Sequence, residues 1–202
     1  IVAGAPLSDS SLAAFLDRHR DVEIELTTDD RIVDVIEGGF DVVVRIQRLA
    51  DSSLVARRIA TDRLVVCGSP AYLDTHGRPQ TPAELIGHNC LHYSLVSRAG
   101  EWRFRGKGRI DLEIPTRGNL SASDGATLRH AAAAGLGLAV VPLFMAAADV
   151  AAGKLELVLE EARRAEIGIY AVYASRRQLP ARTRLLLDHL ATWFATPDWR
   201  LR

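Results

Sequence analysis

Apolar and polar positions alternate along the chain in short segments with two different periods. Residues 11–20 (SLAAFLDRHR) place apolar side chains at 12, 15 and 16 and charged ones at 17, 18 and 20, a spacing typical of an amphipathic helix. Residues 22–27 (VEIELT) instead alternate with a period of two, which predicts a strand with one buried face. The apolar residues 1–5 (IVAGA) predict another strand. Strands that alternate with helices in this way predict an α/β fold with a mostly parallel sheet.

The next part of the chain continues this alternation. Asp30 can cap a helix over 31–37, and Gly38-Gly39 ends it because glycine adopts a left-handed conformation at little cost. The valine-rich residues 40–46 (FDVVVRI) then predict a buried strand. After a polar loop we expect two more strands joined by a loop, at 53–60 (SLVARRIA) and 62–69 (DRLVVCGS).

The second half begins with a change of composition. Residues 69–79 (SPAYLDTHGRP) combine Pro and Gly with a short helical piece, which is typical of a boundary between lobes. Thr81-Pro82-Ala83-Glu84 is a capping box that predicts a short helix. Ser123 or Asp124 caps an alanine-rich helix that Gly135 ends. Further predicted elements are a hairpin at 101–114 around Gly106–Gly108, strands at 138–142, 153–159 and 167–175, and an amphipathic helix at 182–195.

The composition is that of an ordinary soluble globular protein, with 48% hydrophobic and 25% charged residues among 202. Twenty-five basic residues balance 25 acidic ones, so no bulk positive field draws the chain to nucleic acid. If the protein acts on DNA, another part of the molecule must hold it. No apolar run approaches the ~18 residues of a membrane helix. Two cysteines form no disulfide framework and favour a reducing cytoplasm.

Five stretches, in their order and spacing, resemble the effector-binding domain of LysR-type transcriptional regulators. They are GFDVVVRI (39–46), LADSSLVARRI (49–59), SPAYLDTHGRPQTPAEL (69–85), HNCLHY (88–93) and AAAAGLGLAVVP (131–142). The resemblance implies two α/β lobes of the periplasmic-binding-protein type (type 2), joined by two crossing strands, with a small molecule bound between them. It implies that residues 1–68 and 172–202 form lobe I and residues 69–171 form lobe II.

Two features depart from the family pattern. Between Ser8 and Phe15 the family usually has several more residues, which affects any ligand contact from the start of the first helix. At Ser123 the family often has Asn, so the polar contact there would differ in reach.

The winged helix-turn-helix that precedes this domain in the family is absent from this chain. The resemblance therefore implies that DNA is bound through that missing N-terminal domain and not through this chain.

Arg45 is the sharpest candidate for ligand binding, because it follows the buried run Val42–Val44. A guanidinium can hold a carboxylate through two parallel hydrogen bonds, each contributing about 1.5–3 kcal/mol where water is excluded. The resemblance places this arginine at the edge of the cleft. The alternative is an internal ion pair, with Asp41 or another acid across the lobe.

Hydroxyls near strand ends supply further candidates for ligand binding. Ser8 follows the first predicted strand, and Thr27 and Thr28 follow the second, where a small polar ligand in an α/β crevice can be reached. Ser123 is placed similarly in the second lobe, although Asp124 beside it would repel an anion and favours capping. Ser69 begins the second lobe, and Gly68 lets backbone approach closely; the residues predicted to bind ligand are thus Ser8, Thr27, Thr28, Arg45, Gly68, Ser69 and Ser123. The alternative role of the hydroxyls is helix capping or turn formation.

The cysteines and histidines raise the possibilities of a redox switch and a zinc site, but their positions in the sequence favour neither. Cys67 with Cys90 could form a redox switch, but a small buried hydrophobe is the preferred interpretation of Cys67. His88, Cys90 and His92 alternate along one predicted strand, too far apart to bind one zinc ion without bending. We find no phosphate-binding loop or nucleophile elbow, so no metal, cofactor or enzyme activity is predicted.

The sequence thus favours a ligand-sensing domain of a transcription regulator. A small anionic metabolite would bind between the lobes and pass a conformational change to the DNA-binding domains. The resemblance also implies a homodimer or tetramer of the full-length protein, in which helix 11–20 and strand 22–27 meet the second lobe of a partner. We expect a cytoplasmic protein with no membrane partner. Two alternatives stay open: a solute-binding protein of a transporter, and an enzyme of amino-acid metabolism on the same fold.

Overall fold

The computed structural model describes residues 2–3, 9–29, 38–47, 55–95, 100–105, 111–162, 166–173 and 179–195. These residues divide into two compact units. Unit 1 holds the residues up to Asp62 and those from Ile167 onward, and unit 2 holds Arg63–Glu166. The predicted lobe boundaries, after residues 68 and 171, fall on the same two connecting strands. The predicted helix 31–37 and the hairpin turn at Gly106–Gly108 lie outside the described residues.

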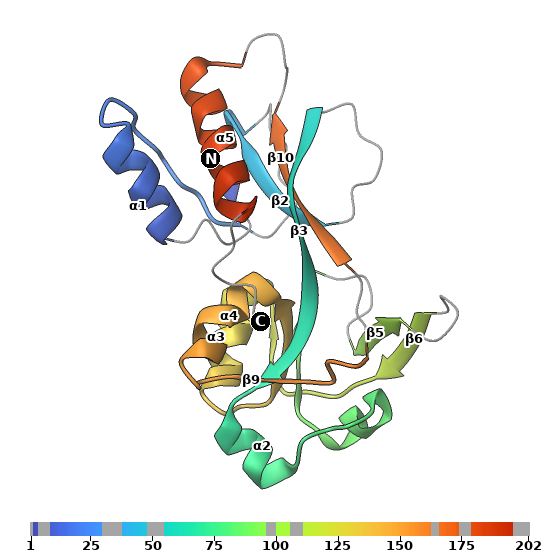
Figure 1. Ribbon diagram of the computed structural model, residues 1–202. Coiled ribbons are helices and arrows are strands. Elements are labelled where there is room, and N and C mark those ends of the chain that lie inside the picture. Colours follow the sequence, from blue (N-terminus) through green and yellow to red (C-terminus); the bar gives the residue numbers. More distant parts are fainter. Residues whose placement is uncertain are drawn as a thin grey trace. The chain divides into compact units, whose positions relative to one another are not determined.

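Unit 1 combines a sheet with two described helices. Its elements are β1 (Val2–Ala3), α1 (Asp9–Arg18), β2 (Val43–Gln47), the first part of β3 (Val55–Gly68), β10 (Glu166–Tyr173) and α5 (Ala181–Ala195). The strand order is β1-β2-β10-β3, with β1 parallel and β10 antiparallel to β2. Figure 1 shows β2, β10 and β3 of this sheet. The strands β3 and β10 also carry the chain between the two units.

Apolar side chains and one histidine hold α1 and α5 together. As predicted, α5 buries apolar side chains at helical spacing: Leu186, Leu187, Leu190 and Phe194. The Nε2–H of His189 on α5 donates to the carbonyl oxygen of Ser11 in α1 at 2.9 Å. The centroid of the His189 ring lies 5.4 Å from that of Phe15. Because Ser11 and Phe15 are one turn apart, a single side chain fixes the start of α1 against α5.

Two predictions about strands in this part of the chain were wrong. Residues 22–26 form no strand, and Thr27 alone takes part in an isolated bridge. The exposure of the side chains still alternates, since Val22 and Ile24 are half-buried and Glu23 and Glu25 are exposed. A period of two thus indicated the more buried face, but it does not show whether a neighbouring strand is present to pair with. The segments 53–60 and 62–69 were expected as two strands, yet β3 is continuous, since no Gly or Pro interrupts it near Asp62.

Unit 2 has a larger sheet and a separate two-stranded one. Its elements are the second part of β3, α2 (Pro70–His76), the 3₁₀-helix η1 (Pro82–Gly87), β4 (Cys90–Tyr93), β5 (Glu101–Arg105), β6 (Asp111–Pro115), β7 (Ser121–Ala122), α3 (Gly125–Ala133), β8 (Leu138–Pro142), α4 (Leu143–Ala151) and β9 (Glu156–Val158). The order is β3-β8-β4-β7, with β9 beside β3, while β5 and β6 pair with each other. Because β3 is antiparallel to β8 and β9, the sheet is mixed and not mostly parallel as expected.

Each face of the unit 2 sheet has its own apolar core. On one face the strands pack against α3 and α4, which lie side by side in Figure 1; this core comprises Val65, Cys67, Leu91, Leu128, Ala132, Ala139, Val141, Leu143, Ala146 and Leu155. On the other face they pack against α2, η1 and the β5–β6 hairpin; this core comprises Val66, Tyr72, Leu73, Leu85, Cys90, Trp102, Phe104, Leu138, Val158 and Leu159. Adjacent residues of a strand thus enter opposite cores. Among the described residues, no helix has both the length and the apolar character needed to cross a membrane.

Candidate functional site

In unit 1, β10 arrives from unit 2 beside the carboxyl end of β2. Gly168 pairs with Gln47, and Tyr170 pairs with Arg45. We call this end of the unit 1 sheet, defined by Gln47 and Gly168, its entry end. Because directly paired residues of antiparallel strands project to the same face, Arg45 and Tyr170 share a face close to the entry end.

The shared face becomes more open toward the entry end. Val43 and its partner Val172 are buried, with 2% and 1% of their surface exposed. Arg45 and Tyr170, the next pair, are only half-buried. Arg45 takes part in an interaction within the chain, so the internal ion pair considered from the sequence stays an alternative to ligand binding. The valine strand therefore ends in a guanidinium at a partly open position.

In unit 2, β3 arrives beside the carboxyl end of β8, where Leu64 pairs with Pro142. The parallel strands β4 and β7 end there too, since Tyr93 pairs with Ala122. We call this the entry end of unit 2. Ser123 follows β7 directly and is exposed. Side chains placed after these carboxyl ends lie where α/β sheets bind ligands.

Asp124, and not Ser123, caps α3. Its carboxylate accepts hydrogen bonds from the backbone N–H groups of Ala126 at 2.9 Å and Thr127 at 3.0 Å. Burial would raise the pKa of Asp124, but the hydrogen bonds from Thr127 and Ala126 hold it below its usual value. This outcome agrees with the preference for capping at Asp124, and it leaves the hydroxyl of Ser123 exposed beside a fixed negative charge.

Gly68 and Ser69 lie at the opposite end of the unit 2 sheet from Ser123. They follow Cys67, which pairs with Ala139 near the start of β8. The Ser69 hydroxyl accepts from the backbone N–H of Tyr72 at 3.1 Å, and only 4% of the residue is exposed. A side chain at position 68 would meet Leu138 at 2.7 Å, so Gly68 permits close packing. The structure gives both residues structural roles and does not bring them to Ser123.

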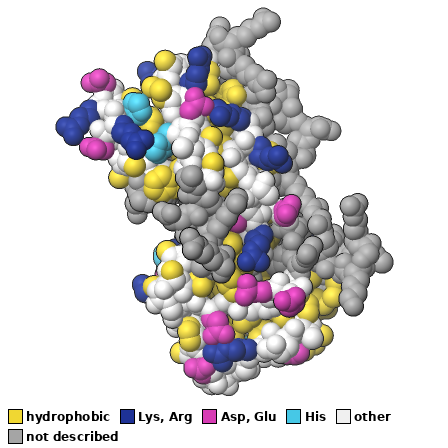
Figure 2. Space-filling model, viewed as in Figure 1, with side chains coloured by type: hydrophobic (Ala, Val, Ile, Leu, Met, Phe, Trp, Pro, Cys, Tyr) yellow, Lys and Arg dark blue, Asp and Glu magenta, His cyan; other side chains and the backbone are white. Residues whose placement is uncertain are grey.

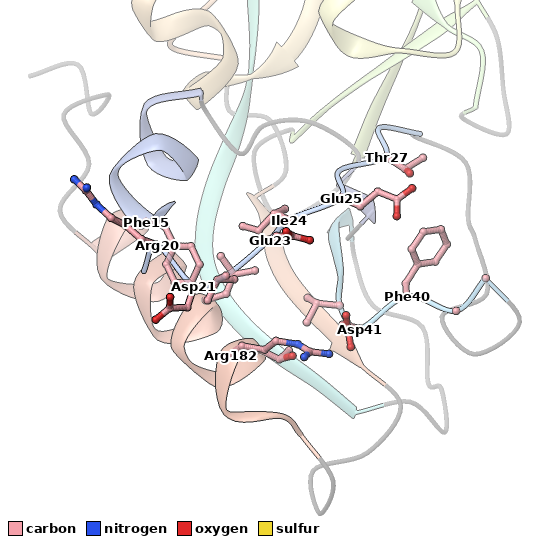
Figure 3. A pocket seen from close by; sticks show the side chains of 16 residues that line it. Phe15, Arg20, Asp21, Glu23, Ile24, Glu25, Thr27, Phe40, Asp41 and Arg182 are labelled. Atoms are coloured by element: carbon pink, nitrogen blue, oxygen red, sulfur yellow. The ribbon is translucent and has the colours of Figure 1, made fainter. Parts of the chain in front are cut away.

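The other predicted hydroxyls are placed differently. Ser8 lies outside the described residues. Thr27 and Thr28 are exposed, and Thr27 lines a pocket within unit 1 of about 680 Å³ (Figure 3). The acidic residues of that pocket are Asp21, Glu23, Glu25 and Asp41. They outnumber its arginines, Arg20 and Arg182, and Arg20 extends away from the pocket and pairs with Asp17 at 3.2 Å. Such a lining does not favour an anion.

The two cysteines lie in opposite cores of unit 2. Cys67 of β3 and Cys90 of β4 both pair with β8, at Ala139 and Leu138, so β8 separates them. Both residues are 0% exposed, and burial raises the pKa of each thiol to about 12. This geometry favours the small buried hydrophobe over the redox switch. No metal-binding group of three His, Cys, Asp or Glu side chains occurs within the described parts of the chain.

Sequence reasoning missed Tyr170 and Gly168 as candidate site residues. The segment 167–175 showed only an apolar central strand, and nothing in it indicated that Tyr170 would pair with Arg45. The available signal was Gly168 inside a strand, because a strand glycine often marks a position where another group approaches closely.

Comparison with known proteins identifies the family. The sequence model of the LysR substrate binding domain matches residues 7–195. The chain belongs to the LysR substrate binding domain family. Among solved structures, the regulatory domain of CrgA, a LysR-type transcriptional regulator from Neisseria meningitidis, is 29% identical to this LysR domain, with a TM-score of 0.84. The match covers 95% of this chain and 96% of that one, and it confirms the predicted α/β fold of the periplasmic-binding-protein type.

The curated relatives of this LysR domain are longer transcriptional regulators. An uncharacterized HTH-type transcriptional regulator from Haemophilus influenzae is 34% identical over 173 residues, covering 84% of this chain and 59% of that protein. The HTH-type transcriptional activator AaeR from Escherichia coli K12 is 31% identical over 182 residues, covering 90% of this chain and 59% of that protein. The chain thus spans about 59% of their length. These relatives are regulators, which overturns the alternative of a transporter's solute-binding protein.

Proposed function

We propose that this LysR domain binds a small carboxylate through Arg45 at the entry end of unit 1, and that binding changes how the two units are arranged. The observation that carries the proposal is the half-buried residue Arg45 at the end of a buried valine strand, on the strand pair where the chain enters the unit. A guanidinium presents its N–H donors in a planar fork, and a carboxylate can accept two of them in parallel at such a position.

In the full-length protein, the change would reach DNA through an N-terminal helix-turn-helix domain. The relatives are HTH-type regulators, and this chain matches only the part of them described above. On the face drawn in Figure 2, basic and acidic side chains of the described residues are interspersed, which gives no basic surface for DNA. We accordingly place DNA binding outside this chain and the protein in the cytoplasm, where its DNA target is found.

We further propose that the full-length regulator is a dimer or a tetramer that uses α1. Leu12 and Leu16 of α1 are only half-buried, and Ala13 is exposed. A helix that leaves apolar side chains accessible on one face is suited to pack against a second copy. Small-angle scattering of this chain at high concentration tests this proposal. A particle of dimer mass is expected, and a strictly monomeric particle would contradict it.

We propose a binding role and no enzyme activity for the chain. The relatives are regulators. Among the described residues, three groups with shifted pKa values, Tyr72, His88 and Cys90, lie close together, but they lie near the amino end of β4, away from the entry end of unit 2. Turnover of a carboxylate by the purified chain would refute this part of the proposal.

The central experiment compares carboxylate binding by the wild type, Arg45→Gln and Arg184→Gln. Calorimetry with a panel of small carboxylates should show binding to the wild type that is at least about tenfold weaker in Arg45→Gln, because a charge-assisted bidentate contact is lost. Arg184 is an exposed arginine of α5, so Arg184→Gln removes the same charge without touching β2 and should bind normally. Equal affinity of all three proteins, with unchanged melting temperatures, would remove Arg45 from the site.

A further inference from the structure

The ring of Tyr170 lies directly over Gly168, two residues earlier on β10. A Cβ atom at position 168 would stand 2.2 Å from Cε2, 2.5 Å from Cζ and 2.6 Å from the hydroxyl oxygen of Tyr170. Contacts below about 3 Å are not tolerated by real side chains, so only glycine allows this ring position. The missing side chain of Gly168 is therefore the reason that the Tyr170 ring can occupy this position over the strand.

The ring of Tyr170 is directed toward the entry end of unit 1. Gly168 precedes Tyr170 on β10 and pairs with Gln47, so a ring lying over Gly168 reaches back from Tyr170 toward that end. Arg45 pairs with Tyr170, and their Cβ atoms are expected about 4.5–5.5 Å apart on the same face. Within the described residues, the Tyr170 hydroxyl has no hydrogen-bond partner. Arg45 and the Tyr170 ring thus share one face of this strand pair, and the Tyr170 hydroxyl is available there.

We propose that Tyr170, held by Gly168, determines which carboxylates this domain accepts. The inference deepens the proposed function and depends on Arg45 binding the carboxylate. With the carboxylate on Arg45, the body of the ligand lies against a ring whose position is fixed by the backbone beneath it. A fixed aromatic surface favours a flat, unsaturated body over a puckered saturated one, because flat groups stack closely on a ring.

Covering a strand glycine with an aromatic ring also stabilises a sheet, so the ring position alone has a structural explanation. That explanation accounts for the contact with Gly168 but not for a half-buried ring beside a guanidinium with its hydroxyl available. The two roles make different predictions. A stabilising role affects the melting temperature of the chain, whereas a specificity role affects the ratio of affinities for two carboxylates.

The test uses benzoate and cyclohexanecarboxylate, which share the carboxylate and ring size but differ in flatness. Calorimetry should show that the wild type prefers benzoate by about threefold to tenfold, the contribution expected of an aromatic pair beyond its buried area. Tyr170→Phe keeps the ring and should keep the preference. Tyr170→Leu removes the ring, and Gly168→Ala displaces it, so both should bring the ratio close to one.

Tyr173→Phe is the matched control, because Tyr173 lies on the opposite face of β10 and is 5% exposed. It should leave the ratio unchanged. If Tyr170→Leu and Gly168→Ala do not fold, NMR of the wild type replaces them. Added benzoate should then shift the ring resonances of Tyr170, which are assigned by their loss in Tyr170→Phe.

The outcomes separate this inference from the proposed function. A benzoate preference that survives in Tyr170→Leu, or unshifted Tyr170 resonances in the presence of bound benzoate, would overturn the role of Tyr170. So would a wild type that binds carboxylates through Arg45 without preferring benzoate. If no carboxylate binds in an Arg45-dependent way, the proposed function falls and this inference falls with it.

Discussion

The burial of the two thiols makes a strong prediction about reactivity. At pH 7, a thiol with a pKa of about 12 is a thiolate in about one molecule in 10⁵, against about one in 10² for the ordinary value of 9.0. Because the thiolate is the reactive form, native Cys67 and Cys90 should be alkylated by iodoacetamide about 1,000-fold more slowly than exposed cysteines. Their complete burial would slow the reaction further.

The assay compares labelling of the native and the guanidinium-unfolded chain by mass spectrometry at pH 7. Both cysteines should react within minutes when the chain is unfolded, and neither should react in the same time when it is native. Peroxide should likewise produce no Cys67–Cys90 disulfide. The two cysteines lie on β3 and β4, which are two strand spacings apart with β8 between them, so their Cα atoms are about 9–10 Å apart. This distance exceeds the ~7 Å limit for a disulfide. Rapid native labelling, or a disulfide in the native chain, would refute the reasoning.

Two further predictions follow from close packing and from a buried histidine. Gly118→Ala would place a Cβ atom 1.7 Å from the carbonyl oxygen of Cys90 and should lower the free energy of unfolding by about 2–3 kcal/mol. The control Gly87→Ala, which has open space around it, should change the free energy of unfolding by less than about 0.5 kcal/mol. Equal urea midpoints of the two variants would contradict this prediction. Burial and the charge of His76 lower the pKa of His88 below 6.5 in the folded chain. The unfolded chain therefore binds a proton at His88 more readily than the folded chain does. The free energy of unfolding should consequently keep its full value above about pH 6.5 and decrease as the pH falls below it. His88→Gln should reduce this loss in urea melts from pH 7 to 5, and an unchanged pH profile would exclude His88 as its source.

Local patterns predicted those features of the fold that depend on neighbouring residues. The apolar face of α5 follows from helical spacing, and it is buried as expected. Asp124 caps α3, and Gly135 follows the helix with a φ of +88°, where glycine is favoured. Each of these features depends on only a few consecutive residues, so a single sequence is enough to predict it.

The helix α4 was missed for a related reason. Its residues Leu143, Met145, Ala146 and Ala147 are all buried, so the segment lacks the polar face that would produce a helical period. A segment that is apolar on every side gives no pattern from which to assign its structure. Its helical form depends on the sheet and on α3, against which it packs.

The candidate site was predicted only in part, because it depends on pairing between distant segments. Arg45 could be selected from its valine run alone. Its pairing with Tyr170 required the register of β10, and the placement of Ser69 and Ser123 at opposite ends of one sheet required the direction of every strand in unit 2. These directions are long-range properties, so the hydroxyls near strand ends could not be sorted by sequence into those that share an end.

The path of the chain through the two units has a consequence for the order in which they form during synthesis. All elements of unit 2 come from one continuous stretch, so its two cores can assemble as soon as that stretch has left the ribosome. Unit 1 cannot be completed until later in synthesis, because β2 pairs with β10, which is made more than 100 residues later, and α5 follows β10. A nascent chain that stops before β10 would therefore carry a finished unit 2 and a first half of unit 1 with its valine strand still uncovered, a natural substrate for chaperones until the last helix arrives.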